Sequence, residues 1–283
     1  MDNNNRYYYK FTRRRRTIER EGMRMFLPVF QGWARSIPYD LMTEADYKLF
    51  VQASVNEDEL LDAYTEFYGY VFEKEGTYQL NQLEKEASST KAYEIPVVGE
   101  ISQWLAAAIR FFQEFGGLYI RSVQQTYIDT IIQLIAQGLA DGKSMQETAK
   151  EVEEYVNKRN FYRWQSERIV RTESGTAMNG ATYQAGEFST LQSEKVWIST
   201  RDARTRGRRN RSRFDHYDAD GQKVDYEEPF LISNLQYGTK EAVAFPGDPR
   251  ASAANKINCR CTFRIKAKRD ENGDLVFKPG VLS

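Results

Sequence analysis

The sequence predicts an α+β protein: a mainly helical N-terminal half with long amphipathic helices, and a small C-terminal α+β module with a short antiparallel sheet. Three observations lead to this prediction. Apolar residues recur at steps of three and four through much of residues 25–186, which is the period of a helix. Beyond residue 186 the period falls to two, as in a half-buried strand. Turn-forming Gly, Pro, Asn and Asp are dense in residues 197–261, where the only histidine and both cysteines also lie.

The composition is that of a folded protein with room for one large or two ordinary domains. The 283 residues carry no net charge, so no overall attraction to nucleic acid is expected. Basic residues are nevertheless concentrated in two places. Residues 1–24 hold eight Lys and Arg against three acidic residues, and residues 201–213 hold seven Arg against one Asp. We therefore expect local basic patches.

No signal for secretion or a membrane span is expected. The basic N-terminus is not followed by the apolar stretch of a secretory leader. The longest apolar run, near residues 105–112, is short and contains Arg110, so it cannot cross a bilayer. On a strand, Cys259 and Cys261 would have Cα atoms about 6.5–7 Å apart, at the outer limit for a disulfide. Free thiols or a metal in a reducing compartment are the better interpretation.

The chain divides into four predicted segments: a basic aromatic arm (1–24), a helical domain (25–143), a C-terminal module (144–268) and a C-terminal hairpin or tail (269–283). The arm carries a basic run of Arg13, Arg14, Arg15 and Arg16. These arginines would contact phosphates in a nucleic-acid-binding arm, with the neighbouring tyrosines stacked on bases. Alternatively, the run is the solvated charged face of a helix start.

Helix signals follow in order. Asn56 precedes an acidic first turn and is typical of an N-cap. Residues 77–91 lack a strong pattern and are expected to form a weak helix or a linker. Residues 97–138 are the strongest helical stretch, which the double glycine at 116–117 is expected to kink or divide. Ser144 and Glu147 form a capping box that opens a helix to about residue 158.

A further helix is expected from Asn160 to between Gly180 and Gly186, and strands follow it. Short strands are predicted at residues 195–199, 230–232 and 242–245. The clearest strand covers residues 258–267, where Cys259, Cys261, Phe263 and Ile265 alternate with polar and basic residues. We expect residues 258–261 to form a central, buried strand near Trp197. Asn272-Gly273 would turn this strand back onto residues 275–277 as a hairpin.

A set of short motifs in the C-terminal half carries a family resemblance. In order, they are Arg168-Ile169-Val170-Arg171-Thr172-Glu173, Ala177, Asn179, Lys195, Trp197, Asp202, Arg204-Thr205-Arg206, His216, Asp220-Gly221, Phe230, Pro246-Gly247-Asp248-Pro249 and Asn258-Cys259-Arg260-Cys261. Together they resemble the Mu F-like minor head protein family of tailed bacteriophages, also called phage head morphogenesis proteins, over roughly residues 144–268. There is one departure. The family's histidine follows Arg-Thr-Arg by a few residues, whereas here residues 207–215 intervene, with Arg208, Arg209, Arg211 and Arg213.

The resemblance implies a structural, non-enzymatic minor capsid protein, present in few copies inside the virion head near the portal vertex and made in the host cytoplasm. It implies a role in head assembly or in genome packaging and ejection, with portal or major capsid protein as partner and no membrane contact. A second hypothesis is a virion protein that binds the packaged DNA through the two arginine-rich segments. A third is a small metal-dependent or histidine-dependent hydrolase or nuclease with His216 as general base. The single histidine and the lack of a paired-carboxylate motif or a glycine-rich phosphate loop argue against the third.

His216, Cys259 and Cys261, with Asp202 or Asp248, are candidate zinc ligands. On a regular strand the two sulfurs would be too far apart to share an ion, so a turn or bulge at Arg260 would be needed. The alternative is that no cofactor binds, the cysteines are small buried apolar residues, and His216 bonds to a turn.

Arg171 and Glu173 are expected to tie their helix to the loop of Asp202, Arg204 and Arg206 through bidentate ion pairs. Alternatively, the helix that carries Arg168, Arg171 and Glu173 is a charged binding face. The expected structural motif also includes Asn179, Trp197, Pro246, Gly247 and Asp248.

Overall fold

The computed structural model describes residues 3–88 and 101–279, and the fold is α+β, as predicted. The chain groups into two units, each made of separate stretches of sequence. Unit 1 comprises Met1–Ile18, Tyr68–Phe111 and Arg171–Ser283, and unit 2 comprises Glu19–Phe67 and Phe112–Val170. The predicted division into four segments stays a prediction, although its first boundary, after residue 24, falls inside a helix.

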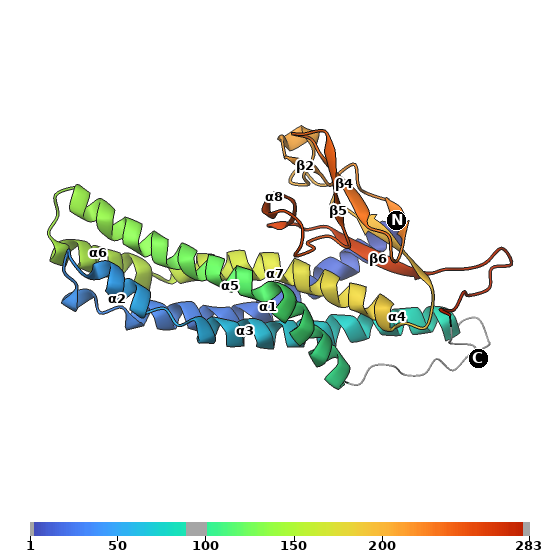
Figure 1. Ribbon diagram of the computed structural model, residues 1–283, viewed down its shortest axis with the longest axis horizontal. Helices are drawn as coiled ribbons and strands as arrows, with labels where there is room; N and C mark the ends of the chain where they lie inside the picture. The colour runs from blue at the N-terminus through green and yellow to red at the C-terminus, as the bar shows by residue number, and fades with distance from the viewer. Residues whose placement is uncertain (1–2, 89–100, 280–283) are drawn as a thin grey trace. The chain divides into compact units, whose positions relative to one another are not determined.

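Helices make up nearly all of the described chain before residue 189 (Figure 1). They are α1 (Asn3–Ser36), the 3-10 turn η1 (Tyr39–Leu41), α2 (Tyr47–Ala53), α3 (Glu57–Val71), the π-helical turn η2 (Phe72–Gly76), α4 (Thr77–Ser88), α5 (Ile101–Ala140), α6 (Met145–Asn157) and α7 (Arg159–Phe188). A short helix, α8 (Ala253–Lys256), lies near the C-terminus. Within the described residues, no helix combines the length and apolar character that a membrane span requires.

Several helix predictions are confirmed. The capping box joins Ser144 and Glu147 at the start of α6, which ends one residue before the predicted limit. The side chain of Asn56 accepts a hydrogen bond from the Asp58 main chain at 3.0 Å, as an N-cap of α3 does. Residues 77–88, expected as a weak helix or a linker, are α4, and the rest of that stretch lies outside the described residues. The double glycine does not divide α5, which is continuous from Ile101 to Ala140.

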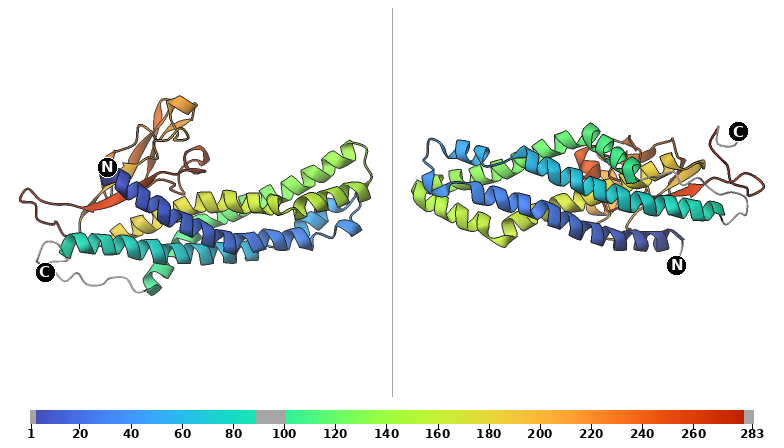
Figure 2. Two further views of the ribbon diagram at one scale, coloured as in Figure 1. Left: turned by 180° about the vertical axis from the view of Figure 1, so that it is seen from behind. Right: turned by 90° about the horizontal axis from the view of Figure 1, so that it is seen from below.

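Unit 2 is a helical assembly with an aromatic core. Phe26 of α1 meets Tyr64 and Phe67 of α3 edge-on, with ring centroids 4.9 and 5.6 Å apart. Trp33 of α1 packs in the same way on Tyr127 of α5 at 5.3 Å. Figure 2 shows α1 and α3 lying side by side. Edge-to-face rings at these distances stabilise a core beyond the burial of their area.

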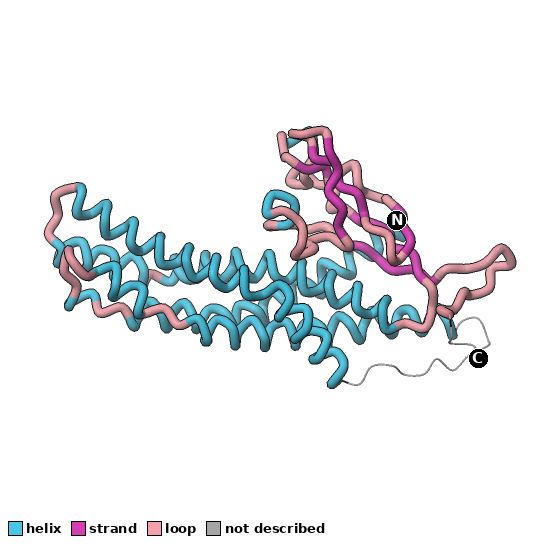
Figure 3. Tube along the Cα trace, viewed as in Figure 1, coloured by secondary structure: helices cyan, strands magenta, loops and turns pink. Residues whose placement is uncertain are grey.

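The strands of the described chain all belong to unit 1 and form two antiparallel sheets (Figure 3). One sheet has the order β3-β1-β6, and the other has the order β2-β4-β5. The strands are β1 (Ser193–Ile198), β2 (Phe214–Asp215), β3 (Lys223–Asp225), β4 (Phe230–Asn234), β5 (Thr239–Val243) and β6 (Thr262–Ala267). Trp197 of β1 lies opposite Phe263 of β6, and both side chains are buried in a common core with Phe230.

One strand prediction is wrong in part. Residues 258–261 are not a strand, because β6 begins only at Thr262, and β6 is an edge strand of its sheet. The two cysteines are nevertheless buried in the same core as Trp197, as expected. The predicted hairpin is confirmed: Gly273 has a φ of 85° at the turn, and Arg269 pairs with Leu275.

Candidate functional site

The Cys259-Arg260-Cys261 segment leaves α8 through a tight turn. Asn258 takes a left-handed φ of 57°, and the main-chain N–H of Cys259 donates to the Lys256 carbonyl at 2.9 Å. The guanidinium of Arg206 donates to the carbonyl of Ile257. The turn lies at Ile257 and Asn258, and residues 259–261 after it have no regular secondary structure. The turn or bulge expected at Arg260 is therefore not found there, yet both cysteine side chains reach His216.

His216 reaches the cysteines in spite of the residues that intervene after Arg206. The main-chain N–H groups of His216 and Tyr217 both donate to the Arg206 carbonyl at 3.0 Å. These two hydrogen bonds close residues 207–215 into a loop with a short helical turn, η3 (Arg208–Asn210), and the strand β2. The insertion therefore loops out, and the histidine stays next to Arg206.

The two thiols and the imidazole form one buried cluster. Nδ1 of His216 lies 3.5 Å from Sγ of Cys259 and 3.5 Å from Sγ of Cys261. The three candidate ligand atoms all lie within 4.8 Å of one another. The exposed fractions of the three residues are 1%, 5% and 3%. Such a set of two soft sulfurs and one imidazole nitrogen is the donor chemistry of a zinc site.

The thiols influence each other's ionisation. A hydrogen bond from Cys261, together with the nearby imidazole of His216, lowers the pKa of Cys259. The same hydrogen bond and burial raise the pKa of Cys261. Cys259 is therefore the sulfur that carries negative charge more readily.

A chain of hydrogen bonds holds the imidazole from its far side. Nε2 of His216 lies 2.6 Å from Oδ1 of Asn255, whose Nδ2 donates to Oε2 of Glu241 at 2.9 Å. Because the Asn255 amide uses its NH2 group on the carboxylate, its oxygen is the atom that faces the ring. Nε2 must then carry the proton, which leaves the Nδ1 lone pair directed at the sulfurs.

Asp202 is not part of the cluster, contrary to expectation. Its carboxylate makes a bidentate pair with the guanidinium of Arg260, with both N–O distances at 2.6 Å. That pair holds the pKa of the Asp202 carboxyl well below its usual range. Arg260, the residue between the two cysteines, therefore binds the carboxylate of Asp202, which was a candidate zinc ligand.

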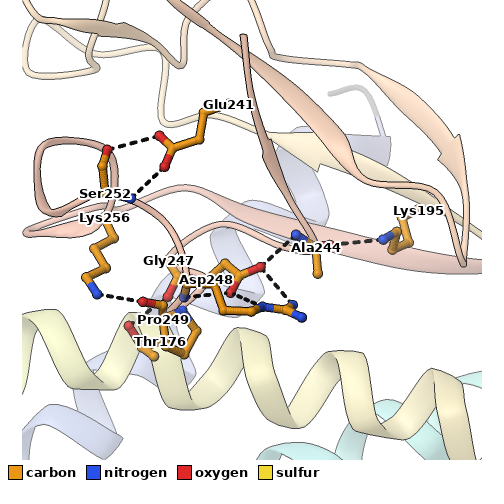
Figure 4. Close-up of polar contacts among 10 residues, drawn as sticks. Thr176, Lys195, Glu241, Ala244, Gly247, Asp248, Pro249, Ser252 and Lys256 are labelled. Atoms are coloured by element: carbon orange, nitrogen blue, oxygen red, sulfur yellow. Dashed lines mark hydrogen bonds and ion pairs between the residues drawn. The ribbon is translucent and has the colours of Figure 1, made fainter. Parts of the chain in front are cut away.

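Asp248, the other candidate carboxylate, folds the Pro-Gly-Asp-Pro loop (Figure 4). Its Oδ2 accepts from the Ala244 main-chain N–H at 2.8 Å, and its Oδ1 accepts from the Arg250 main-chain N–H at 3.0 Å. The Arg250 side chain pairs with the same carboxylate at 2.9 Å. Thr176 of α7 donates to the Gly247 carbonyl at 3.1 Å, and this anchors the loop to the helix.

Asn179 of α7 ties the same loop to the cysteine segment. Its Nδ2 donates to the Pro246 carbonyl at 2.7 Å and to the Cys261 carbonyl at 3.2 Å. Its Oδ1 accepts from the Thr262 hydroxyl at 2.9 Å. One buried amide thus satisfies three groups from two segments, in accordance with its predicted structural role.

The predicted ion pairs between Glu173 and the loop arginines are wrong. The buried Glu173 accepts a 2.5 Å hydrogen bond from the Tyr68 hydroxyl, and burial raises the pKa of its carboxyl to about 7. The main-chain carbonyl of Arg171 accepts from the guanidinium of Arg15. The partners Tyr68 and Arg15 are about 105 and 156 residues away from these positions, so no local pattern could reveal them.

Lys195 was predicted only as part of a motif, and in the structure its side chain binds a main-chain carbonyl group. Its side chain is buried, and Nζ donates to the Ala244 carbonyl at 3.0 Å (Figure 4). Burial lowers the pKa of Lys195 to about 8. The burial of Lys195 could not be predicted, because a lysine within a predicted strand is expected to face solvent.

The candidate arginines for DNA or partner contact differ in their burial. Arg15 is buried and donates to the carbonyls of Cys259 and Arg171, so the expected contact of this residue with DNA is wrong. Arg14 makes a bidentate pair with Glu75 at 2.7 and 2.8 Å. The exposed members are Arg13, Arg16, Arg208, Arg209, Arg211 and Arg213.

Residues 129–264 match the family model described as phage Mu protein F like protein. This stretch, just under half of the chain, is similar to the phage Mu protein F-like family. The resemblance inferred from the ordered motifs is confirmed, and the matched region begins within α5, earlier than residue 144.

The chain also has a curated relative. The chain is 24% identical over 135 residues to the uncharacterized protein YqbB of Bacillus subtilis (strain 168). The match spans 48% of this chain and 40% of the relative. No solved structure matches the chain.

Proposed function

We propose that this protein is a structural, non-enzymatic minor head protein of a tailed bacteriophage, present in few copies inside the head near the portal vertex. The match of residues 129–264 to the phage Mu protein F-like family carries this proposal. The contacts made by the motif residues support a structural role. Asn179, Asp248 and Lys195 each bind main-chain groups of the module, so these residues hold the fold and do not line an open cleft.

The surroundings of the only histidine favour a non-enzymatic role. A general base must reach the proton that it removes from a substrate. His216 is 1% exposed, its Nε2 faces Asn255, and its Nδ1 faces two sulfurs. This arrangement suits a fixed structural side chain better than the base of a hydrolase.

The proposed partners are portal or major capsid subunits, contacted through the helices. Unit 2 exposes large apolar side chains on short elements: Leu41 is 64% exposed and Leu49 is 67% exposed. Exposed apolar side chains mark a contact surface where they form a contiguous patch. We propose that they take part in binding the partner, and that the protein acts in head assembly or in genome packaging and ejection.

The proposal is tested by quantitative mass spectrometry of proheads and mature particles from the phage that encodes this chain. We expect the polypeptide in both, at a few copies for each portal ring. Particles made with an early stop codon in its gene should assemble or package abnormally. If the polypeptide is absent from both kinds of particle, the proposal fails.

A second candidate function, contact with the packaged DNA, is favoured by one observation. A cavity of about 540 Å³ in unit 1 is lined by four cationic side chains and no acidic one: Arg6, Lys10, Arg264 and Lys266. Phosphates bind to such cations with release of counterions, so the affinity should fall steeply with salt. Titration of non-specific duplex DNA against salt tests this function. A Lys10→Gln/Lys266→Gln variant should have a smaller salt slope than the wild type, whereas no binding at low salt rejects the function.

A further inference from the structure

We propose that His216, Cys259 and Cys261 bind one structural zinc ion through Nδ1 and the two Sγ atoms. The site does not depend on the proposed role in the phage head. It would join the segment after β2 to the segment before β6, which are 43 residues apart along the chain at their nearest ligands.

Both sulfur–nitrogen distances in the cluster are those of a tetrahedral zinc site. Zn–S bonds of about 2.3 Å and a Zn–N bond of about 2.0–2.1 Å, at the tetrahedral angle, separate sulfur from nitrogen by about 3.5–3.6 Å. Both sulfurs lie 3.5 Å from Nδ1. Both sulfurs therefore already lie at the distance from Nδ1 that a common ion would set.

Direct S–H hydrogen bonding to Nδ1 accounts for only one of these two contacts. A neutral Nδ1 has a single lone pair, so it accepts one S–H hydrogen bond at a time. Yet Cys259 and Cys261 lie at the same distance from it. An ion placed between the three atoms gives each of them a bond, and it also compensates the charge of buried thiolates.

The surroundings supply the outer hydrogen bonds that a metal-binding histidine needs. Ligating imidazoles usually donate their other N–H to a fixed acceptor, which sets the tautomer and the ring orientation. Here Nε2 donates to Asn255, and Glu241 holds Asn255 in turn. Asn255 is 3% exposed, so this acceptor is itself buried and fixed.

The donors and their burial favour structural zinc. Two thiolates and one imidazole select a soft or borderline ion over magnesium or calcium. Among the described residues, no fourth His, Cys, Asp or Glu joins the cluster. The fourth position therefore falls to an oxygen donor, and the Ser199 hydroxyl, 3.8 Å from the Cys261 sulfur, borders it. All three ligand residues are buried, so the effect of the ion is on folding.

Elemental analysis of the full chain, purified without chelator or metal-affinity steps from zinc-sufficient cells, tests the proposal. We expect one zinc per chain in the wild type and loss of it in His216→Ala, Cys259→Ser and Cys261→Ser. The control is Glu271→Gln, at an exposed position outside the cluster, which should keep the ion. Zinc retained in all three ligand variants would overturn the assignment.

Two measurements on the wild type avoid variants that fold poorly. Replacement of zinc by Co²⁺ should give the near-ultraviolet charge-transfer absorption of cobalt thiolates. Chelator should lower the Tm and make both thiols reactive toward a thiol reagent, and added zinc should reverse both effects. A wild-type protein that lacks zinc and whose Tm responds to neither chelator nor added zinc would contradict the proposal.

Discussion

His216 and Asn255 are joined by a hydrogen bond of 2.6 Å between Nε2 of the ring and Oδ1 of the amide. Both side chains are buried, and the carboxylate of Glu241 fixes the orientation of the amide. This relationship decides the tautomer of the only histidine in the chain. It directs the unprotonated nitrogen to Cys259 and Cys261, so the behaviour of the cluster depends on Asn255 as well as on the three candidate ligands.

Replacement of Asn255 should therefore weaken metal binding without removing any ligand. Asn255→Ala takes away the acceptor that orients the ring, and such losses typically lower metal affinity by about 10–100-fold. Competition for zinc against a coloured chelator measures the change. Asn272→Ala, an exposed asparagine at the C-terminal turn, is the control and should bind zinc as the wild type does. Equal zinc affinities for Asn255→Ala and the wild type would refute the role of Asn255 in orienting the His216 ring.

Asn179 should be among the residues most important for the stability of unit 1. Asn179→Ala leaves the carbonyls of Pro246 and Cys261 and the hydroxyl of Thr262 without their partner. We expect the free energy of unfolding to fall by about 2–4 kcal/mol, since each unsatisfied buried group costs about 1–3 kcal/mol and the site relaxes in part. Urea denaturation measures this loss. Asn179→Asp should do no better, because a carboxylate would face two carbonyl oxygens. A loss below about 0.5 kcal/mol, the usual range of a surface change, would show that the amide is dispensable.

Glu173 should make unit 1 less stable as the pH rises. Burial raises the pKa of its carboxyl to about 7 in the folded protein, above the ordinary value of 4.5. Between these values the folded state keeps a proton that the unfolded chain has lost, so stability is fully present below pH 4.5 and is lost as the pH rises through 7. The cost above pH 7 is on the order of 3 kcal/mol. In Glu173→Gln the urea midpoint should stay nearly constant between pH 5 and pH 8. Glu271→Gln, at an exposed position, should keep the dependence of the midpoint on pH that the wild type has. A midpoint of the wild type that rises over this interval would contradict the sign.

Two glycines of unit 2 should respond in opposite ways to alanine. A Cβ at Gly138 of α5 would lie 2.5 Å from Cγ2 and 2.7 Å from Oγ1 of Thr148, whereas a Cβ at Gly32 of α1 meets nothing within 4 Å. Gly138→Ala should cost about 1–3 kcal/mol through overpacking. Gly32→Ala should be stabilising by about 0.5–1 kcal/mol, because it lowers the entropy of the unfolded chain. Thermal unfolding measures both changes, and Thr148→Ala should rescue Gly138→Ala. A Gly138→Ala protein as stable as Gly32→Ala would contradict this prediction, because Thr148 of α6 would then move aside at no cost.

The sequence predicted the parts of this fold that depend on neighbours along the chain. The capping box at Ser144, the N-cap at Asn56 and the turn at Gly273 were found because each signal and its consequence lie within four residues. The same holds for the strand predicted up to residue 267, which is β6 from Thr262 onward. Such local rules do not require knowledge of the tertiary structure.

The errors share one physical cause, which is that the deciding partner is distant in sequence. The alternation of Cys259 and Cys261 continues the pattern of β6, but the Asn258 turn and the Asp202–Arg260 pair take this segment out of the sheet. Arg15 sits in a run of four arginines that suggests a uniform basic arm. Only the folded chain reveals that this one side chain is buried against the Cys259 carbonyl.

The candidate cluster was predicted in its three chief members but not in its geometry. His216, Cys259 and Cys261 are the only residues of their types in the chain, and this made them conspicuous. Asn255 was missed because an asparagine near a short helix has many uses, and only its position between Glu241 and His216 distinguishes it. The intervening residues 207–215 did not displace His216, because its N–H binds back to the Arg206 carbonyl.

The central claim, that this chain is a structural component of the phage head, is tested most directly by an asymmetric cryo-electron microscopy reconstruction of the portal vertex in proheads and mature particles. The account predicts density inside the head beside the portal that fits the two three-stranded sheets of unit 1. A vertex fully explained by other proteins, with this polypeptide detected nowhere in the particle, would contradict it.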